Sequence, residues 1–577
     1  MFRKNDQHQQ MPLFSSIDAL PEKQLERLEE SWAHTFYHEY FSRIEEDVFG
    51  VLYSDDPSRP NIPTNVLLGL DTLKSGFGWS DAEMYDHFCY DVQVRYALGY
   101  RDLGVGHFEL RTVYNFRARV TDHMQKTGEN LIEKAFEQVT DEQIAAYELK
   151  TGKQRMDSTA IGSNIREMSR LRLLVEVVKR THRMLDEDDQ ERYADEFAPY
   201  LKGSSGQYTY HVKGKEVGDH LQRIGELMQR LVKELSDAYT DEDTYQILQR
   251  VFEEHFITEE SKLRAKEGKE LSASSLQSPD DWEATYRQKR GEDHIGYVAN
   301  IAETCDPSNP FQVITKVQTE SNNTDDAAML NEALPEIKAR MDVDEMTTDG
   351  GYNSPDVDAT MRTHKVKQVQ TAIRGRKPSE EKLGLDGFEW ETNDDSQPQT
   401  VTCPNGQRVE VTNGRKPLRY RAAFESPDCE GCSFDDQCPT RPLKSKPENV
   451  LCFSQQELDL ALRRKRSADA RASKQNLRSA VEATVRAIKH PFGNGKLPVR
   501  GKSRVSMVVI GSAAMNNVRQ IDRYLAKQSK ANKRKKTGAK EVQSDQQSSA
   551  DSFFVSFFAD LQARLRSVGF FEPVWAC

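Results

Sequence analysis

The sequence predicts an α/β protein in which a mixed sheet follows an all-helical N-terminal region. Two short segments rich in β-branched residues, 297–303 and 311–317, are separated by a Pro-containing turn, as neighbouring strands often are. A helical pattern at 325–340 follows, and further strand-like segments lie at 344–349 and 366–372. Strands and helices in this order are typical of a mixed α/β sheet.

Composition excludes several classes of protein. The chain has 577 residues, of which 37% are hydrophobic and 30% charged, as expected of a globular protein with several domains. No apolar run approaches the ~18 residues of a membrane span, and the polar start MFRKNDQHQQ lacks the apolar core of a signal peptide. Eight cysteines are too few for a secreted disulfide scaffold of this length. We therefore expect a cytoplasmic protein without a membrane partner.

Short helices with recognisable ends are expected in the N-terminal region. Ser80 and Glu83 have the spacing of a capping box, in which each side chain satisfies a backbone N–H group at the start of a helix. A later helix at 108–126 carries Arg111, Arg117 and Arg119. Compact helices with arginines on one of them are compatible with a DNA-reading domain, although most small helical domains do not bind DNA.

The pattern along the chain divides it into seven parts. A helical insert interrupts the strand-bearing core, and a long helix without Gly or Pro follows a second, Cys-bearing insert. The expected parts are a helical DNA-binding domain (1–135), the core (140–164 and 290–375), the helical insert (165–289), a Cys-rich loop or β insert (376–453), the long helix with the end of the core (454–525), a disordered basic linker (526–551) and a C-terminal segment (552–577).

Positive charge is concentrated in one part of the chain. Residues 461–540 hold 22 Lys and Arg against three acids, a local balance of +19 in a chain whose net charge is −12. Such an asymmetry indicates a basic face for nucleic acid. A solvated helix face followed by a basic tail would produce the same balance.

Three acids occupy positions at which a metal site is expected. Asp157 and Asp349 each end a predicted strand, and Glu482 lies on the long helix. Carboxylates at strand ends, joined by one from a facing helix, bind two divalent ions ~3.5–4 Å apart, and hard oxygen ligands favour Mg²⁺ or Mn²⁺. Each acid also has an ordinary structural role open to it. Asp157 could be an N-cap or form an Asx turn, Asp349 could lie in a plain turn, and Glu482 could form an i,i+4 pair with Arg478.

The order of these motifs resembles that of the insertion-sequence DDE transposases of bacteria and archaea. The motifs are Asp157-Ser-Thr, Gly296-Tyr-Val, Thr348-Asp349-Gly-Gly-Tyr352 and Arg478-x3-Glu482-x6-Lys489. Residues 58–99 also resemble the helical N-terminal domain of these enzymes. The resemblance implies a ribonuclease-H-like core with a mixed five-stranded sheet.

The resemblance also implies a role for each motif residue. Asp157, Asp349 and Glu482 would be catalytic acids that hold Mg²⁺ or Mn²⁺. Arg478 and Lys489 share a helix face with Glu482 and would contact DNA phosphates. The expected partners are double-stranded DNA, at the terminal inverted repeats and the target, and a second copy of the chain in a synaptic homodimer, which would place the protein at the nucleoid. The neighbouring basic run is expected to bind DNA as well: Arg463, Arg464, Lys465 and Arg466.

Four of the eight cysteines lie close together in the sequence. Cys403 precedes a Gly-containing turn, and Cys429, Cys432 and Cys438 follow with the spacing C-x2-C-x5-C. A C-x2-C pair is a common pair of zinc ligands, so the four residues are candidates for a structural Zn²⁺ site. Four reduced thiols in a loop are the alternative interpretation.

Three functions remain open on these grounds. The first is an active DNA transposase that cuts at the ends of its element and joins the 3′-OH to target DNA by transesterification. The second is a catalytically inactive or domesticated regulator that binds specific DNA sequences. The third is a ribonuclease-H-like nuclease that hydrolyses DNA without strand transfer. The complete set of three acids favours the first.

Overall fold

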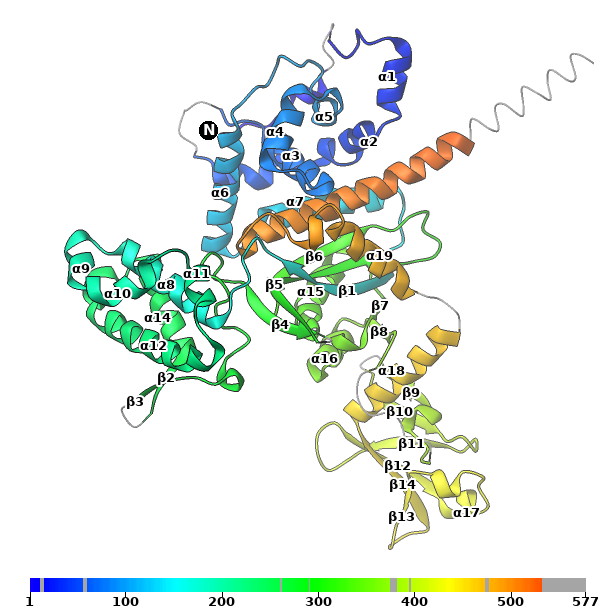
Figure 1. Ribbon diagram of the computed structural model, residues 1–577. Coiled ribbons are helices and arrows are strands. Elements are labelled where there is room, and N and C mark those ends of the chain that lie inside the picture. The colour runs from blue at the N-terminus through cyan, green and yellow to red at the C-terminus, as the bar shows by residue number, and fades with distance from the viewer. Residues whose placement is uncertain are drawn as a thin grey trace, which may run out of the picture. The chain divides into compact units, whose positions relative to one another are not determined.

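The structure is a computed structural model that describes residues 1–10, 15–54, 60–259, 262–289, 291–373, 381–393, 396–472 and 477–531 (Figure 1). The chain separates into two compact units, Met1–Val518 and Arg519–Cys577. All the helices and strands labelled in Figure 1 belong to the first unit. In the described ranges no helix combines the length and the apolar character that a membrane span requires.

The N-terminal region is helical, as the sequence predicts. The capping box at the start of α4 is present, because the Ser80 side chain accepts from the Glu83 N–H and the Glu83 side chain accepts from the Ser80 N–H. α3 ends at Gly78, whose φ of +74° is a conformation that glycine adopts without strain. The helices are α1 (Glu22–Glu29), α2 (Trp32–Glu39), α3 (Thr64–Phe77), α4 (Asp81–Tyr90), α5 (Val92–Ala97), α6 (Leu110–Thr127) and α7 (Leu131–Ala146).

A helix late in the chain completes the core of this region. Residues 502–531 are helical, and the part within the first unit is almost entirely buried from Val505 to Val518. Its apolar side chains belong to the same buried cluster as Phe36 and Leu70 of the N-terminal helices. Burial of this apolar surface holds two distant parts of the sequence together.

The central sheet is mixed. β1 is antiparallel to β5 and parallel to β7, and β7 is parallel to β8. Strands β4 and β6 pair with successive parts of the other edge of β5, which is 13 residues long. The strands are β1 (Lys153–Gly162), β4 (Thr285–Lys289), β5 (Glu292–Thr304), β6 (Ile314–Ser321), β7 (Glu345–Thr348) and β8 (Lys367–Gln370).

The sheet therefore has six strands rather than the predicted five. The additional strand is β4, whose sequence Thr-Tyr-Arg-Gln-Lys lacks the apolar alternation by which strands are recognised. The crossover helices α15 (Asp326–Arg340) and α16 (Pro355–Thr363) connect β6 to β7 and β7 to β8. Both pack against the sheet face that carries Met156 and Ala302.

Helices between β1 and β4 form a second buried cluster of their own. They lie in the helical insert that the sequence predicts at 165–289. The elements are α8 (Arg170–Met184), α9 (Glu187–Arg192), α10 (Ala194–Leu201), α11 (Ser205–Tyr210), α12 (Val217–Glu234), α13 (Ser236–Tyr239), α14 (Asp243–His255) and the hairpin of β2 (Phe256–Glu259) and β3 (Lys262–Ala265).

The Cys-bearing segment folds as a second, antiparallel sheet in the order β13-β14-β12-β11-β10-β9. Its small core contains Phe388, Phe424 and Phe453, and it includes Leu458 of the following helix. The elements are β9 (Glu389–Thr392), β10 (Pro398–Thr402), β11 (Arg408–Asn413), β12 (Arg419–Glu425), α17 (Ser426–Cys429), β13 (Arg441–Pro442) and β14 (Glu448–Ser454).

The single long helix predicted after this sheet is described as two helices. These are α18 (Gln455–Ala472) and α19 (Leu477–Lys489), and residues 473–476 lie outside the described residues. Of the predicted disordered linker, residues 526–531 are helical and 532–551 lie outside the described residues. The predicted C-terminal segment, 552–577, also lies outside them.

Candidate functional site

Asp157 and Asp349 lie beyond the paired part of two neighbouring parallel strands. β1 and β7 pair up to Arg155 and Thr347; Asp157 lies two residues further along β1, and Asp349 directly follows β7. Asp349 Oδ1 accepts a hydrogen bond from the Gly351 N–H at 2.6 Å and so caps the turn after β7. The turn role that the sequence left open for Asp349 is therefore present. Asp349 and Asp157 nevertheless follow the last paired residues of β7 and β1 by the same two positions.

A buried tyrosine lies among three carboxylates at this edge of the sheet. Burial and the charges of Asp326, Asp157 and Asp349 raise the pKa of Tyr352 well above its usual value. The Tyr352 OH group donates to Asn300 Oδ1 at 2.7 Å. Asp326, at the start of α15, accepts a hydrogen bond from Ser158 Oγ at 2.9 Å. Because neighbouring residues of a strand point to opposite faces, this contact lies on the other side of the sheet from the Asp157 side chain.

α19 covers the face of β1 that carries Asp157. Alternate residues of a strand share a face, so Arg155, Asp157 and Thr159 point to the same side of the sheet. Lys489, the last residue of α19, donates from Nζ to Thr159 Oγ1 at 2.8 Å. This contact fixes the C-terminal end of α19 on the strand.

A buried ion pair lies under the middle of α19. Arg155 Nε and Glu303 Oε1, on the adjacent strands β1 and β5, are 2.7 Å apart, and their side chains are 7% and 3% exposed. Thr484 on α19 donates to the other Glu303 oxygen at 2.9 Å. Burial raises the pKa of Glu303, although the positive charge of Arg155 opposes this shift. The carboxylate therefore joins two strands to the helix.

A hollow of about 500 Å³ lies between β1 and α19. Asp157 from the strand and Glu482 and Lys489 from the helix line it, so the structure brings these three predicted residues together. Asp349, which directly follows β7, is not one of the described residues that line the hollow. In the described part of the chain, no three His, Cys, Asp or Glu side chains are grouped as an assembled metal site.

Two cationic or titratable residues in the same hollow were not predicted. Arg486 and His490 line it together with Glu482. Arg486 lies four residues after Glu482, on the helix face that Glu482 shares with Lys489. The helix periodicity that predicted Lys489 would therefore also have identified Arg486. Burial, and to a smaller extent the charge of Lys289, lowers the pKa of Lys489. The hollow thus combines carboxylates with side chains suited to bind phosphate oxygens.

The structure corrects one part of the predicted DNA-binding run. Arg463 is only 4% exposed and forms an ion pair with Asp358 of α16. It therefore joins α18 to α16 and is not a surface cation. Lys465 is exposed and Arg464 and Arg466 are half-buried, so these three remain candidates. The side chain of Arg478 lies outside the described residues.

The four predicted zinc ligands meet around one small cavity of about 30 Å³. All four thiols are free and half-buried. Burial raises the pKa of Cys429, and the proximity of Cys438, Cys403 and Cys432 adds to the shift. Two separate loops therefore bring together cysteines that lie up to 35 residues apart in the sequence.

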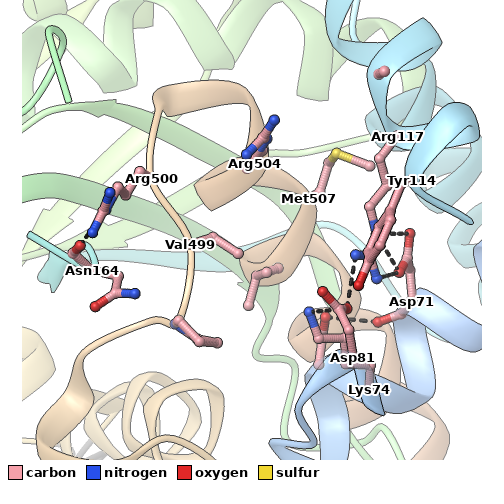
Figure 2. A pocket seen from close by; sticks show the side chains of 14 residues that line it. Asp71, Lys74, Asp81, Tyr114, Arg117, Asn164, Val499, Arg500, Arg504 and Met507 are labelled. Carbon is pink, nitrogen blue, oxygen red and sulfur yellow. Dashed lines mark hydrogen bonds and ion pairs between the residues drawn. The ribbon is translucent and has the colours of Figure 1, made fainter. Parts of the chain in front are cut away.

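A second hollow, of about 440 Å³, lies between the N-terminal helices and the segment that starts the helix at 502 (Figure 2). Figure 2 shows Arg117 of α6 bound to Asp71 and Asp81, with Lys74 beside them. The charges of the two aspartates raise the pKa of Arg117 although burial opposes the shift. Arg117 therefore holds α3, α4 and α6 together instead of standing as a free DNA-reading cation. Arg504 lies across the hollow from this cluster.

Comparison with known families agrees with the sequence motifs. Residues 402–522, about a fifth of the chain, match a family model described as "Transposase DDE domain". No curated protein and no solved structure matches the chain. The matched segment contains Glu482, Lys489 and the four clustered cysteines, whereas Asp157 and Asp349 precede it. The match supports a DDE transposase, a class of enzyme that acts on DNA and generally uses divalent metal ions.

Proposed function

We propose that this chain is the transposase of an insertion sequence, with a catalytic triad of Asp157, Asp349 and Glu482. The observation that carries the proposal is the parallel pairing of β1, which carries Asp157, with β7, which directly precedes Asp349, together with the hollow that Asp157 and Glu482 line. The strand order and directions of the central sheet favour a ribonuclease-H-like core. The family match over α18 and α19 supports the same assignment.

The donor set suits Mg²⁺ or Mn²⁺. Asp157, Asp349 and Glu482 would supply carboxylate oxygens, and Mg²⁺ and Mn²⁺ prefer hard oxygen ligands. Two such ions would lower the pKa of an attacking water or hydroxyl group and stabilise the leaving oxygen.

The residues of the chain would then position DNA for two displacements at phosphorus. In the first, a water oxygen bonds to the phosphorus at the element end, and the 3′ oxygen leaves with a proton. In the second, this 3′-OH bonds to a target phosphorus, and the 3′ oxygen of the target strand leaves. Lys489 and Arg486 would hold the phosphate oxygens during both steps, since they line the same hollow as Asp157.

The remaining assignments follow from the same reaction. Both ends of an element must be held at once, so we propose a homodimer bound to two terminal inverted repeats and the target duplex. Lys465, Arg464 and Arg466 would extend the contact along the DNA backbone. The protein would act in the cytoplasm at the nucleoid.

The direct test is cleavage and strand transfer on the DNA that flanks the gene for this chain. Wild type, Asp157→Asn, Asp349→Asn and the exposed control Asp356→Asn are compared with Mg²⁺ or EDTA, and DNA binding is measured in parallel by anisotropy. Asn can replace Asp as a cap, so the fold around the turn is retained. We expect cleavage to fall at least about 100-fold in the first two variants and to stay unchanged in the control.

Each other outcome assigns a different function. Specific binding without cleavage by wild type would favour the DNA-binding regulator. Cleavage without joining would favour the nuclease that only hydrolyses DNA. Activity that survives both substitutions would mean that the active site lies elsewhere.

A further inference from the structure

The turn that carries Cys403 has the backbone of a metal-binding knuckle. Cys403 lies between β10 and β11, where its N–H donates to the Gln407 carbonyl at 2.8 Å and the Gly406 N–H donates to the Cys403 carbonyl at 2.8 Å. The Gln407 N–H also points at Cys403 Sγ, at 3.3 Å. Gly406 has a φ of +88°, which a residue with a side chain adopts only with strain. A backbone N–H directed at sulfur stabilises a thiolate more than a thiol.

A second turn presents two further cysteines in a similar way. Cys429 ends α17, and the Cys432 N–H donates to the Cys429 carbonyl at 3.2 Å. Between them Gly431 has a φ of +73°, which allows the tight turn. Cys438 follows a short 3-10 helix that begins at Asp435. All three cysteines therefore lie in the connection between β12 and β13, on the other side of the cavity from the Cys403 turn.

The cavity between these turns has room for one ion. Its volume of about 30 Å³ exceeds the roughly 10–15 Å³ that a single water requires. Phe388, Phe424 and Phe434 form part of its wall, and the four cysteines line the same cavity. Soft thiolate ligands in a set of four favour Zn²⁺.

The surrounding sheet has a small buried core. Its buried cluster contains eight hydrophobic residues, and Cys403 and Cys429 lie at the margin of this cluster. Cores this small commonly depend on a metal or a disulfide for stability. A link between the β10–β11 turn and the loop after β12 would join the two halves of the sheet.

We propose that Cys403, Cys429, Cys432 and Cys438 bind one structural Zn²⁺ as four thiolates. On binding, each thiol releases its proton to solvent and forms a Zn–S bond, with no oxidation or reduction. Zinc binding draws the four sulfur atoms together to Zn–S distances of ~2.3 Å in a tetrahedral arrangement. The described residues by themselves show no assembled group of three metal ligands. The zinc stabilises the sheet on which α18 packs through Leu458. The inference does not rest on the transposase activity.

The test measures zinc in the full-length protein, purified without chelator and under reducing conditions. Mass spectrometry of the metal content compares wild type with Cys432→Ser and with Cys452→Ser, because Cys452 is an exposed cysteine of the same sheet that lies outside the cavity. We expect one Zn²⁺ per chain in wild type and in Cys452→Ser, and less than half in Cys432→Ser. Cobalt-loaded wild type should show the spectrum of a tetrahedral tetrathiolate site.

Several results would overturn the proposal. Wild type that contains no zinc and whose cysteines all react freely with a thiol reagent would do so. A Cys429–Cys432 disulfide in the freshly purified protein would replace zinc by a redox pair, and stoichiometric iron would replace it by another metal. A cobalt spectrum with oxygen ligands, or zinc loss in Asp435→Asn with retention in Cys438→Ser, would assign a different ligand set. The wild-type measurements remain decisive even if Cys432→Ser fails to fold.

Discussion

Thr484 on α19 donates a hydrogen bond to Glu303 on β5, and the same carboxylate forms a buried ion pair with Arg155 on β1. Thr484 follows Glu482 by two residues, so this contact sets the position of the predicted catalytic helix on the sheet. Glu303 is only 2% exposed, so its charge is stabilised by the Arg155 and Thr484 side chains and not by water. The position of Glu482 therefore depends on Glu303, which belongs to none of the four motifs found in the sequence.

Glu303→Gln is expected to destabilise the protein. The substitution keeps the shape of the side chain but removes the negative charge of its buried ion pair with Arg155, which costs about 3 kcal/mol. The urea midpoint of the variant should fall below that of wild type. Glu292→Gln, at an exposed position of the same strand, is the control and should leave it unchanged. Equal midpoints for all three proteins would contradict the structural role assigned to Glu303.

Lys489→Met is expected to weaken DNA binding and cleavage together. Lys489 lines the hollow with Asp157, and loss of one phosphate contact should reduce the slope of log K against log salt by about 1. Anisotropy titrations at several salt concentrations measure this slope. Lys202→Met removes an exposed lysine between β1 and β4 and should change neither quantity. An unchanged slope in Lys489→Met would remove Lys489 from the DNA contact.

Arg463 and Lys465 should respond in opposite ways to substitution by Ala. Arg463→Ala leaves Asp358 buried without its partner, so we expect a loss of about 3 kcal/mol in the free energy of unfolding and an unchanged salt slope. Lys465→Ala should leave stability unchanged and reduce the salt slope, because its side chain is exposed. Denaturant unfolding and DNA titration of both variants check the pair. A reduced salt slope in a fully stable Arg463→Ala variant would show that Arg463 contacts DNA.

His255 should make the helical region after β1 sensitive to acid. Burial, reinforced by the charges of Arg170 and Lys266, lowers the pKa of His255 to about 4. The unfolded chain takes up this proton near pH 6.5, so stability is complete above pH 6.5 and is lost as the pH falls toward 4. The loss should reach about 2 kcal/mol at pH 5.

Unfolding of wild type and His255→Gln at pH 7.5 and pH 5 measures this dependence. The variant should lose less stability than wild type between the two values, whereas His211→Gln, at an exposed position, should behave as wild type. The same pH dependence in all three proteins would indicate that His255 does not carry the effect.

Local patterns in the sequence predicted most of the elements. The capping box of Ser80 and Glu83, the helix at 325–340 and the strand before Asp349 depend on residues within a few positions of one another, and the structure confirms them. The strand expected to end at Asp157 instead runs on to Gly162, because its pairing with β5 continues to that residue. β4 was missed, because its polar sequence carries no local signal. The order of the acidic motifs and the four cysteines was also readable, because these residue types are distinctive on their own.

Only the tertiary structure decided which of these residues meet. β1, which carries Asp157, and β7, which directly precedes Asp349, become neighbours through parallel pairing that no local pattern encodes. Within the same basic run, Arg463 is buried against Asp358 while Lys465 stays exposed, and the difference arises from the packing of α18 on α16. The sequence by itself thus determined the kind of chemistry this protein carries. The long-range burial of side chains, which depends on every packed neighbour at once, decided where that chemistry can take place.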